Sequence, residues 1–122
     1  MLLLKRFAGL VLAFFCFQEA ALAASMTWRF RAYDRYQVDV KMWSKNRNNV
    51  WPSSTTVWTL KDFNVHSLKI TCVAGEKICY GATQRGNSKK YWGVGGNGKL
   101  GCANCCFTCQ EGFVTPIMNL NE

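Results

Sequence analysis

Polar and apolar side chains alternate one by one along two stretches in the first half of the chain. Residues 28–33 read Trp-Arg-Phe-Arg-Ala-Tyr, and residues 36–43 read Tyr-Gln-Val-Asp-Val-Lys-Met-Trp. A period of two in aromatic and β-branched residues is typical of a strand with one buried face. We therefore predict two β-strands here, joined by a short connection at residues 34–35.

Shorter segments of the same character follow at regular intervals. Strands are predicted at residues 55–60, 65–72, 77–83 and 91–94, and turns rich in Gly or Asn separate them. No long helical pattern appears beyond the N-terminal apolar run. This arrangement predicts an all-β fold, a small antiparallel sandwich or barrel-like domain. Residues 115–122 have no periodic pattern, and we expect this C-terminal tail to fray.

The chain begins with the three zones of a secretory signal peptide, predicted over residues 1–23. A positively charged start precedes an apolar run at 7–17, which is too short to span a bilayer, and an Ala-Leu-Ala motif follows. Cleavage is predicted after Ala23 or Ala24, which leaves a single domain of residues 24–122. We expect a secreted or periplasmic protein that is not an integral membrane protein.

Six of the seven cysteines lie in the second half of the chain, and the last four form a C-x2-C-C-x2-C cluster. An even number of cysteines in an exported protein predicts disulfide bonds, and the sequence leaves their pairing open. The C-x2-C spacing also suits thiolate ligands of zinc or thiol redox chemistry. We expect no cofactor, with zinc at the cluster as the alternative. The six cysteines are Cys72, Cys79, Cys102, Cys105, Cys106 and Cys109.

The composition is basic, because 15 Lys and Arg residues against 7 Asp and Glu give a formal net charge of +8. Such a charge attracts anionic partners, and aromatic rings beside cations suit sugar rings or anionic headgroups. Two loops carry both kinds of residue, although their tryptophans could equally belong to the core. The candidate binding residues are Trp43, Lys45, Arg47 and Trp51 at the first loop, and Arg85, Lys89, Lys90, Tyr91 and Trp92 at the second.

Groups suited to catalysis are sparse. The acidic residues show no paired spacing of the kind that a glycosidase needs. His66 is the single histidine, and it falls on the apolar side of a predicted strand. The Gly-rich run at 93–99 matches the start of a phosphate-binding loop, but Leu100 stands where that motif requires Ser or Thr. We interpret this run as a turn and predict no catalytic residue.

We therefore expect a non-enzymatic binding or interaction module for an anionic or carbohydrate surface. Its expected partners are an anionic polysaccharide, a lipid headgroup or an acidic protein surface, and nucleic acid is not expected. One alternative is a secreted toxin, inhibitor or host-directed effector. A second alternative, which we favour less, is an envelope enzyme that uses His66 or a cysteine.

Overall fold

β1 (Ala23–Ala32) is the central strand of a three-stranded sheet in the computed structural model, which describes residues 22–121. It runs antiparallel to β5 (His66–Val73) on one side and parallel to β9 (Phe113–Leu120) on the other. The β1–β5 pairing extends over the full length of β5, from His66 opposite Phe30 to Val73 opposite Ala23.

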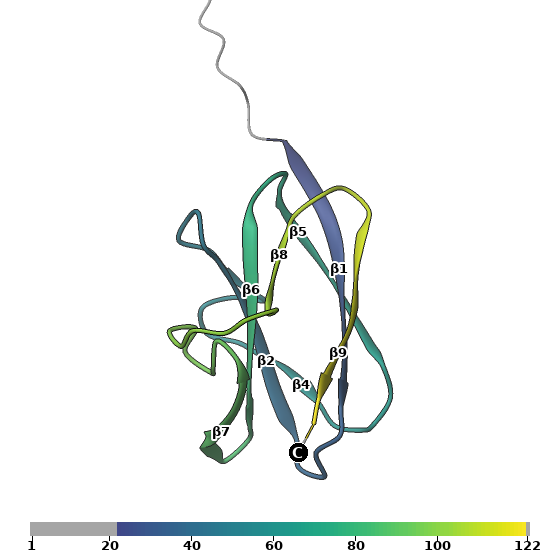
Figure 1. Ribbon diagram of the computed structural model, residues 1–122, viewed down its shortest axis with the longest axis vertical. Coiled ribbons are helices and arrows are strands. Elements are labelled where there is room, and N and C mark those ends of the chain that lie inside the picture. Colours follow the sequence, from purple (N-terminus) through teal and green to yellow (C-terminus); the bar gives the residue numbers. More distant parts are fainter. Residues whose placement is uncertain (1–21, 122) are drawn as a thin grey trace, which may run out of the picture.

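A second, six-stranded sheet faces the first (Figure 1). β2 and β6 form its antiparallel centre, and two further strands pair with the outer edge of each. The strands are β2 (Val38–Ser44), β3 (Val50–Trp51), β4 (Trp58–Leu60), β6 (Lys77–Gln84), β7 (Asn87–Gly93) and β8 (Cys106–Thr108).

The core lies between the two sheets and is built from the alternating positions. Trp28 and Phe30 of β1 are fully buried, as are Val38, Val40 and Met42 of β2. The ring of Tyr80 in β6 contacts both, with centroids 6.0 Å from Trp28 and 5.2 Å from Phe30. Burying one large apolar side chain contributes about 1.5–3 kcal/mol. The expected all-β sandwich of mostly antiparallel strands is confirmed.

Two of the three disulfide bonds tie the C-terminal third of the chain to the sheets. Cys72–Cys109 joins β5 to the segment before β9, and Cys79–Cys106 joins β6 to β8. Cys102–Cys105 closes a short loop in front of β8. The expectation of disulfide bonds among these six cysteines is therefore confirmed, and the structure supplies the pairing that the sequence left open.

The prediction that residues 115–122 fray is wrong for the part that the structure describes. Residues up to Leu120 belong to β9, and Thr115 and Leu120 are fully buried. The stabilising partner is β1, some 86 residues earlier in the chain, as in the hydrogen bond from the Arg29 amide to Thr115 Oγ1. The buried positions of β9, Thr115 and Leu120, are five residues apart, so its sequence shows no period of two.

The predicted signal peptide lies almost entirely outside the described residues. Its predicted cleavage positions, after Ala23 or Ala24, fall within the first residues of β1, where Ala24 is buried opposite Cys72. Cleavage and export therefore stay predictions. Within residues 22–121, no helix is long and apolar enough to cross a membrane.

Candidate functional site

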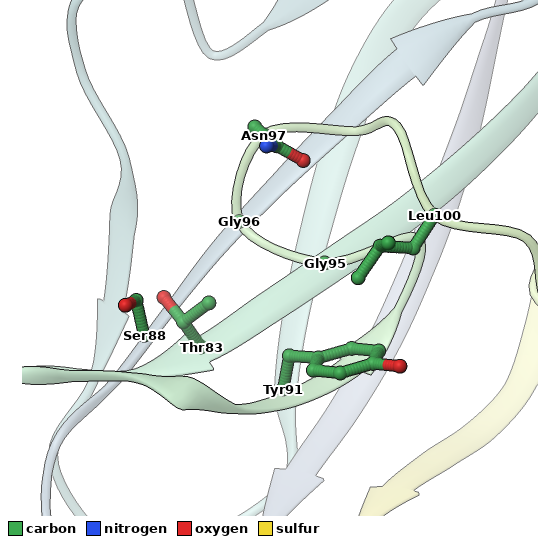
Figure 2. Close-up of a pocket in the computed structure, with 7 residues that line it drawn as sticks. All are labelled: Thr83, Ser88, Tyr91, Gly95, Gly96, Asn97 and Leu100. Carbon is green, nitrogen blue, oxygen red and sulfur yellow. The ribbon is translucent and has the colours of Figure 1, made fainter.

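A hollow of about 450 Å³ opens on the outer face of the six-stranded sheet, beside the β6–β7 hairpin. Figure 2 shows Tyr91 and Leu100 at one end of it, with Ser88 and Thr83 at the other and Asn97 on the loop above. No charged side chain lines it. The lining residues are Thr83, Ser88, Tyr91, Gly95, Gly96, Asn97 and Leu100.

Strand pairing places the side chains of the hollow on one face. Thr83 of β6 is paired with Tyr91 of β7 on one side and with Asp39 of β2 on the other. Directly opposed residues in neighbouring strands point to the same face of a sheet. The carboxylate of Asp39, the hydroxyl of Thr83 and the phenol ring of Tyr91 therefore lie side by side on three neighbouring strands. Tyr91 is 46% exposed.

The loop at 93–100 forms the roof of the hollow because glycines let it lie close to the sheet. A side chain on Gly81 of β6 would collide with the Gly95 carbonyl, and a side chain on Gly98 would collide with the ring of Trp43. Backbone hydrogen bonds from Gly98 N to Gly95 O (3.3 Å) and from Leu100 N to Val94 O (3.1 Å) close the loop on itself.

Trp43, a predicted binding residue, therefore lies half-buried beneath the loop and supports it. Its indole ring packs against Gly98 of the loop and does not stand free as a stacking surface for a ligand.

Arg85, another predicted binding residue, lies beside this row. Its Nε donates to Asp39 Oδ2 (3.3 Å), and its Nη1 donates to Gln37 Oε1 (3.0 Å). The second oxygen of Asp39 accepts a hydrogen bond from Thr59 Oγ1 (2.8 Å). The Arg85 side chain remains 54% exposed. This polar cluster continues the outer face from the hollow toward the β2–β4 edge.

The other cations and aromatics of the second loop have separate contacts. Lys90 Nζ lies 3.2 Å from the carboxylate of buried Asp34. Trp92 is paired with buried Ala82, which places it on the inner face, and its Nε1 donates to Asn121 O (2.8 Å). Lys89 is exposed. Among the predicted binding residues, Tyr91 is thus the one that lines the hollow.

The first predicted loop lies at the far end of β6, because Lys45 N donates to Lys77 O at the start of that strand. Lys45 of the first loop and Arg85 of the second therefore lie at opposite ends of β6, about 23 Å apart at the usual rise of a strand. Lys45 itself is exposed. The structure does not bring the two predicted loops into one site.

Trp51 and Arg47 of the first loop are engaged in internal contacts. Trp51 is 8% exposed, and its Nε1 donates to Thr71 O (2.9 Å). The Arg47 guanidinium lies 5.7 Å from the Trp51 ring and forms a two-pronged ion pair with Glu76. Glu76 is buried, and one of its oxygens also accepts from the Val73 amide (2.9 Å).

The sulfur atoms of Cys79, Cys105 and Cys106 lie within 4.8 Å of one another. Each belongs to a disulfide bond in this structure, and thiolates are the form that binds a metal ion. These three would be the ligands if the bonds were reduced, and zinc stays the alternative to the expectation of no cofactor.

His66 has a partner that the sequence analysis missed. Its Nε2 lies 2.7 Å from Asp62 Oδ1, four residues earlier in the chain. The Asn64 amide and then His66 lower the pKa of the Asp62 carboxyl. Among residues 22–121, no hydroxyl or thiol hydrogen-bonds to the His66 ring. A Ser-His or Cys-His mechanism needs such a nucleophile, and catalysis through His66 stays a hypothesis.

The polar residues of the hollow also escaped the sequence analysis. Thr83, Ser88 and Asn97 are small polar residues of a common kind, and nothing in their spacing sets them apart. The spacing of the glycines at residues 93–98 was the feature of the sequence that could have indicated the hollow. Comparison with known proteins adds no assignment, since no family model, curated protein or solved structure matches the chain.

Proposed function

We propose that the protein is a non-enzymatic binding module that holds a carbohydrate chain in the hollow at Tyr91. The observation that carries the proposal is the exposed ring of Tyr91 opposite Thr83, with the hydroxyl of Ser88 and the amide of Asn97 in the same hollow. The apolar face of a sugar ring packs on a phenol ring. Hydroxyl and amide groups then donate to and accept from the sugar hydroxyls.

The chemistry of the lining favours a neutral sugar unit over a small anion or a metal ion. None of the seven lining residues carries a charge, and a binding site of this type needs a few well-placed polar groups on an otherwise neutral wall. Cations stand next to the hollow instead, with Arg85 and Lys89 on the hairpin and Lys99 on the loop. A longer, acidic polysaccharide would meet them as it leaves the hollow.

The experiment measures binding of soluble oligosaccharides, one set neutral and one set built of uronic acids, by isothermal titration calorimetry. Tyr91→Ala is expected to weaken binding about tenfold, because the stacking surface is removed. Tyr36→Ala is the matched control, since Tyr36 is 53% exposed on the β1–β2 connection and lines no part of the hollow. Unchanged binding by Tyr91→Ala would overturn the proposal.

Binding measured at different salt concentrations distinguishes stacking in the hollow from attraction to the neighbouring cations. Stacking in the hollow should persist as ionic strength rises, whereas the added affinity for acidic chains should fall. The sequence also predicted a toxin, inhibitor or effector role and an envelope enzyme, and both stay hypotheses. The exposed His66–Asp62 pair is where a test of the enzyme would begin.

A further inference from the structure

Three connections between strands meet at one end of the sandwich, which is the lower end in Figure 1. They are residues 33–37 between β1 and β2, residues 61–65 between β4 and β5, and the turn at 85–86 between β6 and β7. We call this surface the basic aromatic end.

Strand register shows that the three connections are neighbours. Val38, the first residue of β2, is paired with Leu60 at the end of β4 and with Gln84 at the end of β6. Phe30, near the end of β1, is paired with His66 at the start of β5. The connections at 33–37 and 61–65 therefore both cross from one sheet to the other at this end.

Three aromatic side chains stand exposed here. Tyr33 is 43% exposed, Tyr36 is 53% exposed and Phe63 is 57% exposed. A single exposed aromatic side chain needs no explanation, but several on adjoining connections of one end mark an interaction surface. The Phe63 side chain has no polar atom, so its exposure to water is not compensated by a hydrogen bond.

Cations accompany these rings. The Arg31 guanidinium lies 5.8 Å from the centre of the Tyr33 ring, and the Arg35 guanidinium lies 5.3 Å from that of Tyr36. Lys61 begins the connection that carries Phe63 and is exposed.

The acidic residues at this end are each paired with a basic group. Asp34 is paired with Lys90 and Asp39 with Arg85, whereas Asp62 is paired with His66, which adds no formal charge at pH 7. Among residues 22–121, Arg31, Arg35 and Lys61 form no salt bridge, so the basic aromatic end is left with a positive charge.

We propose that the basic aromatic end docks on the surface of an anionic phospholipid bilayer. Phe63, Tyr33 and Tyr36 would enter the boundary between headgroups and acyl chains, and Arg35 and Lys61 would meet lipid phosphates. Aromatic residues favour this boundary, and each nearby Lys or Arg adds attraction to an anionic leaflet. An acidic polysaccharide or protein would satisfy the cations but would provide no apolar layer beneath the charges for Phe63. The bilayer is therefore the occupant that fits both features.

The test is co-sedimentation of the disulfide-bonded protein with vesicles of phosphatidylcholine and phosphatidylglycerol, compared with vesicles of phosphatidylcholine alone. Binding is expected on the anionic vesicles, with loss as salt is raised. The double variant Arg35→Gln/Lys61→Gln should bind about 30-fold more weakly. Lys45→Gln/Lys77→Gln removes the same charge from exposed lysines at the other end of β6, and should bind like the wild type.

Phe63→Ala distinguishes a bilayer from an acidic surface. Loss of one inserted ring should weaken vesicle binding about tenfold while leaving the net charge unchanged. Wild-type binding by Phe63→Ala, equal losses in the two charge variants, or no vesicle binding at all would overturn the proposal. Tyr91→Ala should retain vesicle binding, so this test and the carbohydrate test can fail separately. Near-ultraviolet circular dichroism confirms that each variant is folded.

Discussion

Gly98 lies directly on the indole ring of Trp43, and on the same face of the sheet Gly81 lies against the carbonyl of Gly95. Neither glycine could carry a side chain without pushing the loop at 93–100 away from the sheet. The hollow beside Tyr91 is therefore formed before any ligand arrives. A preformed site binds with a smaller loss of conformational entropy than a flexible one.

Replacing Gly98 with alanine tests this packing. The φ of Gly98 is +77°, which alanine rarely adopts, and the added Cβ would meet the Trp43 ring. We expect Gly98→Ala to lose about 1–3 kcal/mol of unfolding free energy. Urea unfolding followed by tryptophan emission measures the loss. Gly101→Ala is the control, since a Cβ there meets no atom within 4 Å, and equal losses in both variants would contradict the account.

Glu76 ties the stability of the fold to pH. Burial by itself raises the pKa of this carboxyl, but hydrogen bonds from Arg47, Ser44 and the Val73 amide outweigh burial and hold the pKa below its ordinary value of 4.5. The unfolded chain therefore binds the proton more readily than the folded chain. Glu76 stabilises the fold above about pH 4.5, and this contribution is lost as the pH falls through the folded-state pKa.

Substitution of Glu76 should reveal that contribution. We expect Glu76→Gln to lose about 1–3 kcal/mol of unfolding free energy at neutral pH, because Arg47 and the Val73 amide lose a charged acceptor. The variant should also show a shallower decline in acid. Urea midpoints measured from neutral pH to about pH 3 test both effects. Glu111→Gln serves as the exposed control, and an acid decline of unchanged steepness in Glu76→Gln would disprove the assignment.

The three disulfide bonds should differ in their contributions to stability. Cys72 and Cys109 are separated by 37 residues, whereas Cys102 and Cys105 are separated by 3. In the chain-entropy view, removing the first bond should cost about 4 kcal/mol and removing the second about 1.5 kcal/mol. Unfolding of the two double serine variants measures this order, and the reverse order would be inconsistent with the pairing.

The pairing itself is tested by peptide mapping. Cys105 Sγ lies 3.7 Å from Cys106 Sγ, and both lie within 4.8 Å of Cys79 Sγ. Mass spectrometry of the unreduced digest should find Cys79 linked to Cys106. A peptide that links Cys79 to Cys105 would require a different connection between β6 and the segment before β8.

Sequence reasoning identified the strands whose pattern is local. β1, β2 and β5 each alternate between more and less buried residues, and that alternation is visible in the chain itself, whereas β6 is buried at almost every position. β9 was missed because its buried residues, Thr115 and Leu120, do not follow a period of two, and its register against β1 shifts between Thr27 and Arg29. A short strand such as β3 has too few residues to show any period.

The candidate site was less predictable than the fold for the same reason. Tyr91 belonged to the predicted set, but Thr83 and Asn97 meet it through hairpin pairing and through the close approach of the Gly-rich loop. Trp51 looked like a loop residue beside cations and is in fact buried. Whether an aromatic residue next to a loop faces solvent depends on the strand register, which the sequence does not state.

Thr115 illustrates the role of the distant pairing. Its Oγ1 accepts a hydrogen bond from the Arg29 amide (3.1 Å) at the place where the register of β1 and β9 shifts. Thr115→Val keeps the shape but leaves that amide without its partner. We expect a loss of about 1–3 kcal/mol in urea unfolding. Val114→Thr is the control on the exposed neighbour, and wild-type stability of Thr115→Val would show that the hydrogen bond is dispensable.

The most direct measurement of the central claim is an amide NMR titration of the isotopically labelled protein with neutral and acidic oligosaccharides. The account predicts shifts concentrated at Thr83, Ser88, Gly96 and Asn97, and lost in Tyr91→Ala. Shifts confined to other surfaces, or no shift at saturating sugar, would contradict the proposal that the hollow at Tyr91 binds carbohydrate.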